Sequence, residues 1–213
     1  MSHYAYDSSS SDDSLLISET SPSWPAACPA PNGIHKVKYH PGHAWDFALD
    51  TAQAPVDVTL VLPHYRARNQ PLGHRLALFV GNDSGVKVKL ARINPQTKFT
   101  LDIQGASSDV TVWIPSDYCG AIALATNARP VLSAGFSNKV LPNVRFQRAS
   151  THAVDTDSPD DHIEVTTAGR VTFRMWDVRT GSPESAQRET LKRVFGRGSH
   201  KPTTDAWDFL LED

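Results

Sequence analysis

Apolar and polar residues alternate in short runs along the middle of the chain, and these runs come in pairs. Alternation with a period of two is typical of a β-strand that buries one face. Each pair predicts two strands joined by a short connection, and the repetition predicts an all-β fold. The clear pairs are Leu78/Val80 with Val86/Val88, Leu101/Ile103 with Val110/Val112, and Ile163/Val165 with Val171/Phe173, and a weaker one joins Ile122/Leu124 to Val131.

The connections within these pairs are rich in glycine, aspartate and serine. Glycine adopts positive φ without strain, and short polar side chains hydrogen-bond to nearby backbone, so we expect tight corners. We assign these residues a structural role rather than a chemical one. The predicted corner residues are Asp83, Ser84, Gly85, Ser108, Asp109 and Gly169.

The spacing of the pairs indicates how the strands stack. Four equivalent apolar positions are separated by steps of 23, 21 and 41 residues: Val80, Ile103, Leu124 and Val165. Units of about 21–24 residues suit a short β-solenoid, in which each coil buries its apolar face against its neighbours. A β-sandwich of successive hairpins is the alternative. A solenoid would place Val86 beside Val110, whereas a sandwich would pair Val80 with Val86 across an antiparallel turn.

Composition divides the chain into three parts. Residues 1–33 are rich in serine and proline and hold four acidic residues but no lysine or arginine, so we expect a disordered acidic tail. Residues 34–180 are predicted to form the all-β domain, with the polar stretch 145–161 as an insertion. Residues 181–213 are predicted to be a charged, partly helical tail, in which Ser182 caps a helix that begins at Pro183.

Charge and hydropathy argue against several partners. Residues 34–180 hold 16 basic and 13 acidic side chains, which is no strong footprint for nucleic acid. No apolar run approaches the ~20 residues that cross a bilayer. The N-terminus lacks the basic start and apolar run of a secretory signal. We therefore expect a soluble intracellular protein, cytoplasmic or nuclear, with no membrane partner.

Candidate catalytic and metal sites are weak. Ser84 lies in a glycine-flanked corner and Cys119 follows a strand end, and neither is placed in a motif that activates a nucleophile. The acidic run at 155–161 lacks the glycine and glutamate of a calcium loop. Three histidines cluster near the start of the fold without a zinc-binding spacing: His35, His40 and His43. We expect no catalytic residue, no metal and no cofactor.

The C-terminal segment carries the most suggestive partner motif. On a helix, Trp207, Leu210 and Leu211 would share one face, with Phe209 beside them and acidic residues around them. Such a segment can dock into a basic-rimmed apolar groove of a partner. The alternative is that its aromatic side chains pack on the β surface of this same chain.

One resemblance rests on two segments. The run from Phe79 to Val86, followed by the strand end Val110–Asp117 with the sequence Val-Thr-Val-Trp-Ile-Pro-Ser-Asp, resembles a domain family of fungal proteins that has no assigned function. The resemblance covers roughly residues 45–178 and implies an all-β module. The repeats are also distantly similar to the repetitive β domains of bacterial adhesins.

These observations favour a non-catalytic protein-interaction or scaffold module whose protein partner the sequence does not name. A carbohydrate- or ligand-binding β domain is the alternative, with Trp45, Trp113 or Trp176 as a platform. A row of solvent-facing aromatic rings on one sheet face would support that alternative.

Overall fold

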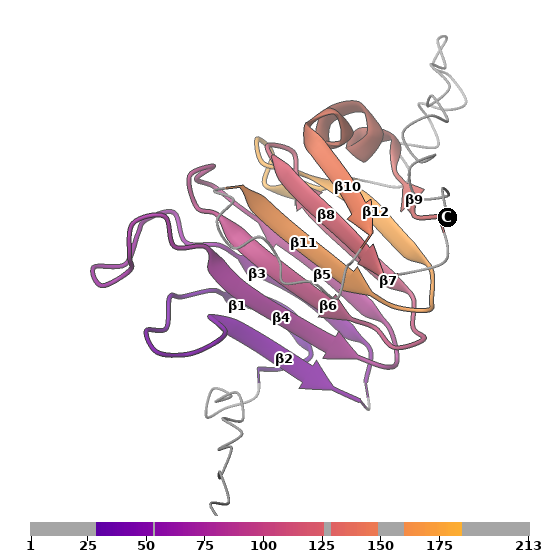
Figure 1. The fold of residues 1–213 in the computed structure, drawn as a ribbon, viewed down its shortest axis with the longest axis horizontal. Helices are drawn as coiled ribbons and strands as arrows, with labels where there is room; N and C mark the ends of the chain where they lie inside the picture. Colours follow the sequence, from indigo (N-terminus) through magenta and orange to yellow (C-terminus); the bar gives the residue numbers. More distant parts are fainter. Residues whose placement is uncertain (1–28, 53, 126–128, 149–159, 185–213) are drawn as a thin grey trace, which may run out of the picture.

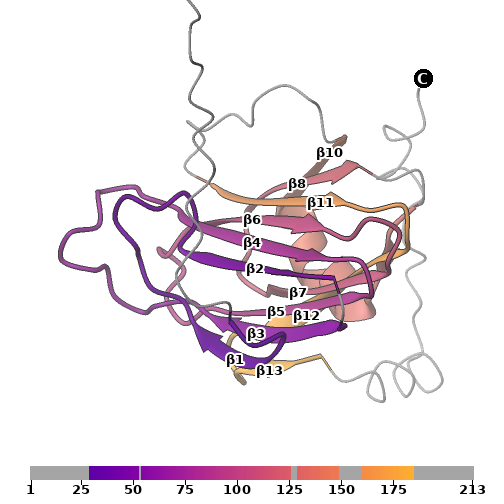
Figure 2. The same cartoon turned by 90° about the horizontal axis from the view of Figure 1, so that it is seen from below.

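The computed structural model describes residues 29–52, 54–125, 129–148 and 160–184, and in them the chain forms two β-sheets that face each other (Figures 1 and 2). We call these sheets A and B. Sheet A contains, in spatial order, β1 (Asn32–Lys36), β3 (Val56–Val61), β5 (Val86–Ala91), β7 (Val110–Pro115), β12 (Val171–Asp177) and β13 (Ser182–Pro183), with β9 (Val131–Leu132) also paired to β12. Sheet B contains β10 (Val144–Arg148), β8 (Gly120–Ala125), β11 (Asp161–Thr166), β6 (Phe99–Gln104), β4 (Leu76–Asn82) and β2 (Phe47–Thr51).

The predicted alternation builds a single core between the sheets. Along β3, Val56, Val58 and Leu60 are buried while the residues between them are partly exposed, and the same period of two recurs in β5, β6 and β7. Because successive side chains of a strand point to opposite faces, each strand contributes every second residue to the core. The core of sheet B is formed mainly by Leu76, Leu78, Val80, Phe99, Leu101, Ile103, Ile122, Leu124, Ile163 and Val165.

Strand pairing confirms the solenoid prediction. Val86 pairs with Val110 in parallel, and Val110 pairs with Val171. Val80 pairs with Ile103 of the next coil. The sandwich alternative, which required Val80 to pair with Val86, is therefore wrong. Within the described part of the chain, strand pairs are parallel except the short pairing of β12 with β13. The chain thus passes from sheet B to sheet A and back in each coil.

The coils do not stack in the order of the sequence. In sheet B, β11 pairs on one side with β6 and on the other with β8, so a strand late in the sequence lies between two earlier ones. Figure 1 shows β11, in orange, between the magenta β6 and the pink β8. The coil β11–β12 is therefore inserted between the coils β6–β7 and β8–β9.

The prediction of a polar insertion at 145–161 is wrong at both of its ends. Residues 145–148 belong to β10, which pairs in parallel with β8, and Asp161 begins β11 with its side chain buried. Polar residues alternate with Val144 and Phe146 in β10 because this strand lies at the edge of sheet B. Residues 149–159 lie outside the described part.

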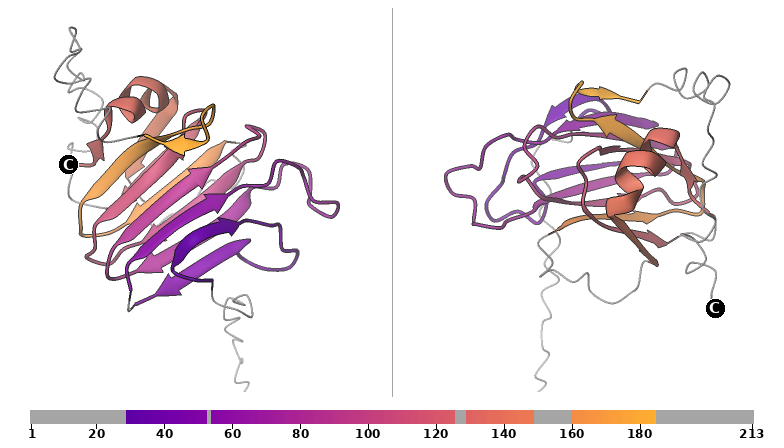
Figure 3. Two further views of the ribbon diagram at one scale, coloured as in Figure 1. Left: turned by 180° about the vertical axis from the view of Figure 1, so that it is seen from behind. Right: turned by 90° about the horizontal axis from the view of Figure 1, so that it is seen from above.

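One end of the stack is covered by a short helix that the alternation did not predict. The helical turns Phe136–Val140 and Leu141–Asn143 follow β9. The ring of Phe136 stacks on that of Phe173 with centroids 5.6 Å apart, and Val140 is buried beside them. Figure 3 shows the helix across this end of the two sheets.

The predicted cap at Ser182 is wrong. Ser182 and Pro183 form β13, which pairs antiparallel with Asp177 and Trp176 of β12 instead of starting a helix. The following Glu184 continues the contact, since its backbone N–H donates to the carbonyl of Met175. Residues 185–213, the rest of the C-terminal tail predicted to be partly helical, lie outside the described residues. Residues 1–28 of the predicted N-terminal tail also lie outside them.

Candidate functional site

Two rungs on the outer face of each sheet carry opposite charge, although both faces are built by the same alternation. We define surface A as the ten outward side chains of two rungs of sheet A. They are Asn32, Asp57, Lys87, Thr111 and Thr172 in one rung, and Ile34, Thr59, Lys89, Trp113 and Arg174 in the next. Surface A thus holds three cations and one carboxylate.

The corresponding part of sheet B holds carboxylates only. Surface B is defined by the rungs Ala48, Phe79, Asp102, Glu164 and Ala123, and Asp50, Gly81, Gln104, Thr166 and Ala125. Asp102 and Glu164 are direct neighbours across β6 and β11. Burial raises the pKa of Asp102, and burial together with the charge of Asp102 raises the pKa of Glu164. Like charges on neighbouring strands destabilise a sheet, so the repulsion between Asp102 and Glu164 makes surface B the less favourable of the two surfaces.

Trp113 is the centre of surface A. The Nζ atom of Lys89 lies 5.3 Å from the centroid of the indole ring, and the guanidinium carbon of Arg174 lies 5.9 Å from it. A cation over an exposed aromatic ring contributes about 0.5–1 kcal/mol. Lys89 also forms an ion pair with Asp57 of the neighbouring strand. Trp113 is therefore held between two cations that come from the strands on either side of it.

The indole N–H of Trp113 is an unused donor. Its Nε1 atom is buried and finds no hydrogen-bond acceptor among the described residues. A buried donor without a partner is costly, and such groups point to an unfilled interaction. Because this nitrogen is closed to solvent, the part of Trp113 that a partner meets is defined by the cations of Lys89 and Arg174 beside its ring.

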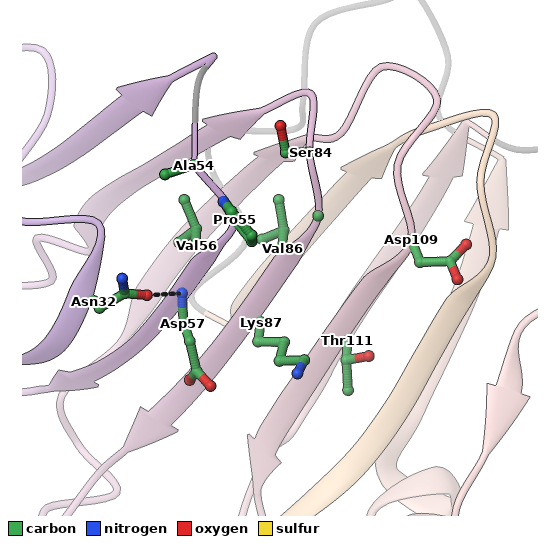
Figure 4. Close-up of a pocket in the computed structure, with 11 residues that line it drawn as sticks. Asn32, Ala54, Pro55, Val56, Asp57, Ser84, Val86, Lys87, Asp109 and Thr111 are labelled. Carbon is green, nitrogen blue, oxygen red and sulfur yellow. Dashed lines mark hydrogen bonds between the residues drawn. The ribbon is translucent and has the colours of Figure 1, made fainter.

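A groove lies at the start of the same face, where the corners meet sheet A (Figure 4). Its volume is about 510 Å³, and its apolar lining comes from Ala54, Pro55, Val56 and Val86. The polar residues at its rim are Asn32, Asp57, Ser84, Lys87, Asp109 and Thr111, and Gly85 completes the lining.

The charges at the rim are not equivalent. Asp57 pairs with Lys89, and Asp109 accepts a hydrogen bond of 2.9 Å from the backbone N–H of Arg170. Lys87 is exposed and forms no ion pair within the described part of the chain. Figure 4 shows Lys87 between Asp57 and Thr111. The groove therefore presents a lysine charge at Lys87 and a carboxylate charge at Asp109, while the charge of Asp57 is balanced by Lys89.

Two predicted corner residues of the first connection, Ser84 and Gly85, line this groove. Asn82, which the sequence reasoning left out, organises them: its Oδ1 accepts from the N–H groups of Ser84 and Gly85 at 2.7 and 2.8 Å. Gly85 has φ of 132°, a conformation that favours glycine. Asp83 is exposed. An Asn two residues before Ser-Gly was a readable signal for an Asx turn.

The predicted residues of the other connections stack on the first. Ser108 is buried, and its hydroxyl donates to the carbonyl of Asn82 at 3.1 Å. A Cβ on Gly169 would lie 2.3 Å from the carbonyl oxygen of Ser108, so only glycine fits there. Thr167, also missed, accepts from the N–H of Gly169 and donates to the carbonyl of Ser108. These corners form a hydrogen-bonded column.

A buried ion cluster lies on the opposite side of the stack. The side chains of Arg92 and Asp161 are fully buried, and Nη1 of Arg92 lies 2.6 Å from the carboxylate of Asp161. Nη2 donates to Asp117 at 2.9 Å. Burial opposes the charge of Arg92, but the carboxylates of Asp161 and Asp117 outweigh it and raise the pKa of Arg92. Burial and the charge of Asp161 raise the pKa of Tyr118 well above its usual value, so the hydroxyl stays protonated and donates to the carbonyl of Ala121.

The remaining sequence candidates are spread over the molecule. The ring of Trp45 packs on Phe79 with centroids 5.3 Å apart, on the outer side of sheet B. Trp176 is on the outer side of sheet A but only 8% exposed. The Trp207, Phe209, Leu210 and Leu211 cluster lies outside the described residues.

Within residues 29–184, gaps excepted, histidine, cysteine and acidic side chains do not converge in a group that could hold a metal ion. In the same part of the chain, none of the helices has the length and apolar run needed to cross a bilayer.

The fold and surface define an all-β, solenoid-like module with charged outer faces. The chain belongs to a family described as a domain of unknown function, DUF7330, whose model matches residues 45–178. Neither a curated protein nor a solved structure matches the chain.

Proposed function

We propose that this chain is a non-catalytic protein-interaction module that binds acidic segments of partner proteins on surface A. The cations of surface A surround Trp113, whose indole N–H has no acceptor in the described structure. A carboxylate of a partner on surface A would face the cations of Lys89 and Arg174. Charge complementarity of this kind raises association rates and excludes partners of the wrong charge.

The solenoid architecture supports this use of surface A. Parallel strands about 4.8 Å apart hold the outward side chains in fixed rungs, so a partner meets a preorganised surface. Preorganisation reduces the entropy lost on binding. The cytoplasm or nucleus is the compartment that this proposal assumes.

A non-catalytic role agrees with how the titratable groups are used. Arg92 and Asp161 neutralise each other in the core. His74 pairs with Asp46 at 3.1 Å, and the other oxygen of Asp46 accepts from the N–H of His40. These five side chains and backbone groups contact other parts of the fold and do not line the groove.

The carbohydrate-binding alternative has less support. A sugar ring stacks on an exposed aromatic face, whereas Lys89 and Arg174 lie over the ring of Trp113. Trp45 lies with sheet B, away from Trp113 and Trp176. The similarities to a fungal domain family and to adhesin repeats remain parts of the proposal and specify no ligand.

Binding to short fluorescent peptides tests the proposal. We expect the chain to bind acidic peptides that contain an aromatic residue, and to bind their lysine-substituted counterparts at least about tenfold more weakly. Raised salt should weaken the acidic complex because the charges are near the surface.

A double charge reversal on surface A, compared with a single reversal elsewhere, locates the site. Lys87→Glu combined with Lys89→Glu should weaken binding about tenfold or more. Lys139→Glu changes an exposed lysine of the end helix, outside surface A, and should leave the affinity unchanged. Equal binding of acidic and basic peptides, or equal loss in all variants, would overturn the proposal, and preferential binding of neutral oligosaccharides through Trp113 would favour the alternative.

A further inference from the structure

We infer that the chain's own C-terminal segment, residues 203–213, occupies surface A when no partner is present. This inference rests on the proposed function of surface A and names its intramolecular occupant. It makes the segment a competitor that an external acidic partner must displace.

The described structure places the start of this tail beside surface A. Glu184 donates its backbone N–H to the carbonyl of Met175 in β12, the strand that carries Arg174. The carboxylate of Glu184 accepts from the N–H of Gly135 at 2.8 Å and from the hydroxyl of Ser133. The chain therefore leaves the described part at the edge of sheet A rather than at sheet B.

The length of the connection allows the contact. Residues 185–202 separate Glu184 from the segment. As a flexible coil, a linker of this length has a root-mean-square reach of about 21–25 Å, and helical turns within it, at about 1.5 Å per residue, would give a similar reach. From β12 to β5 is two strand spacings, or about 10 Å. The segment can thus reach Arg174, Trp113 and Lys87 without stretching its linker.

The segment complements surface A in both charge and apolar character. Residues 205–213 contain four acidic residues and no basic one, with Trp207 and Phe209 between them. Surface A carries the cations Lys87 and Arg174, and also Lys89, whose charge is shared with Asp57. The adjoining groove offers an apolar lining for an aromatic side chain.

The N-terminal residues are the competing occupant within this chain. Residues 1–28 also contain four acidic residues, but these are spread over a segment three times as long as residues 205–213. The C-terminal segment has the higher charge density and places its aromatic residues between its acids. Salt screens exposed charges that are farther apart than about a Debye length, so only closely spaced acidic residues act together on the cations of surface A. The C-terminal segment is therefore expected to be attracted more strongly than the N-terminal one.

The consequence is a measurable competition. A tethered segment acts at a local concentration of about millimolar for short flexible linkers. A trans peptide must then compete with it, which weakens the apparent affinity of the full chain about tenfold or more. Removing the segment should expose surface A without altering the rungs that form it.

The experiment compares the full chain with a chain truncated after Pro202. The probe is a fluorescent synthetic peptide of residues 203–213, measured by anisotropy. We expect the truncated chain to bind this peptide about tenfold or more tightly than the full chain does. In the truncated chain, Lys87→Glu with Lys89→Glu should abolish the binding, and Lys139→Glu should not.

A charge exchange provides the direct check. In the full chain, Asp205→Lys with Asp208→Lys should release surface A and raise binding of the wild-type probe to the level of the truncated chain. A probe with these two changes should regain binding to the truncated chain that carries Lys87→Glu and Lys89→Glu. This rescue requires the two sets of charges to face each other.

The outcomes separate the two proposals. Equal binding to the full and truncated chains would overturn the inference, whereas surface A would remain a peptide site. Release by deletion of residues 1–28 instead of 203–213 would also overturn it. Failure of the 203–213 probe while other acidic peptides bind would reject this occupant alone, and failure of every acidic peptide would reject both proposals.

Discussion

The two sides on which the chain passes between its sheets are built differently. On the side leading from sheet B to sheet A, the connections are short, as at residues 83–85, 105–109 and 167–170, and neutral hydrogen bonds of Asn82, Ser108 and Thr167 join them. On the returning side, the connections span residues 62–75, 92–98 and 116–119, and a buried ion cluster joins the last two of them to β11.

The difference follows from the order of the coils. On the first side, each corner stacks on its neighbour in a repeated way, so short polar side chains suffice. On the returning side, β11 enters between β6 and β8 from a distant part of the sequence. Arg92 of the β5–β6 connection contacts both Asp117 of the β7–β8 connection and Asp161 of β11. The ion pair between Arg92 and Asp161 has a fixed geometry and can therefore hold β11 in place, although β11 does not follow β6 in the sequence.

The largest effect is expected from breaking the ion cluster. Asp161→Ala leaves the guanidinium of Arg92 buried without its main partner, which should lower the free energy of unfolding by about 3–5 kcal/mol. Asp160→Ala is the matched control, because that carboxylate is one-third exposed and should cost less than about 1 kcal/mol. Urea unfolding measures both, and equal losses would mean that the returning side does not depend on the cluster.

A smaller effect is expected on the neutral side. Asn82→Ala removes the acceptor for the N–H groups of Ser84 and Gly85 and the donor to Ala54. Because Asn82 is buried, we expect a loss of about 1–3 kcal/mol. Asn94→Ala removes a similar turn contact, to Gln96, and a solvent-exposed hydrogen bond to the carbonyl of His64 on the returning side, and should cost about 0.5 kcal/mol or less. If thermal unfolding ranked Asn94→Ala above Asn82→Ala, the column of corners would not be the structural element described above.

The smallest effect on the free energy of unfolding is expected on surface B, which lies on the strands that run between the two sets of connections. Asp102→Asn removes one of two adjacent carboxylates and should raise the free energy of unfolding at neutral pH by about 0.2–1 kcal/mol. The folded wild type has a raised pKa at Asp102, so its carboxyl binds a proton more readily than in the unfolded chain. Wild-type stability should therefore fall as pH rises from the ordinary carboxyl range through that raised pKa.

The advantage of Asp102→Asn should accordingly shrink on acidification. Urea unfolding at a series of pH values checks this, with Asp50→Asn, a carboxylate of the same surface without a carboxylate neighbour in its rung, as the control. A variant less stable than wild type at neutral pH would show that the hydrogen bond from Gln104 to Asp102 outweighs the repulsion.

The strands and their faces could be predicted because alternation records burial directly. The equivalence of Val80, Ile103, Leu124 and Val165 is confirmed by the register of four neighbouring strands. The sequence Val-Lys-Val-Lys-Leu at 86–90 already indicates two lysines on one outer face. The predicted neighbours Val86 and Val110 also imply that Lys89 lies beside Trp113, but Arg174 on the other side of Trp113 could not be predicted, because β12 is distant in sequence from β7.

Some local signals were outweighed by tertiary contacts. Ser182-Pro183 resembles a helix start, but pairing with β12 satisfies its backbone in a strand instead. Val37 and Tyr39 alternate like a strand, yet β1 ends at Lys36. Asp161 looked like part of a solvated acidic loop, and only the position of Arg92 shows why a carboxylate is buried there.

The amino-acid sequence by itself determined the all-β class, the two-strand unit and the side chains of each strand that enter the core, because these depend on periodicity within a few residues. The tertiary structure alone decided the order of the coils, the ion cluster that holds β11 and the assembly of surface A. Those features depend on which strands become neighbours, and that choice is made by packing energies summed over the whole core rather than by any local pattern.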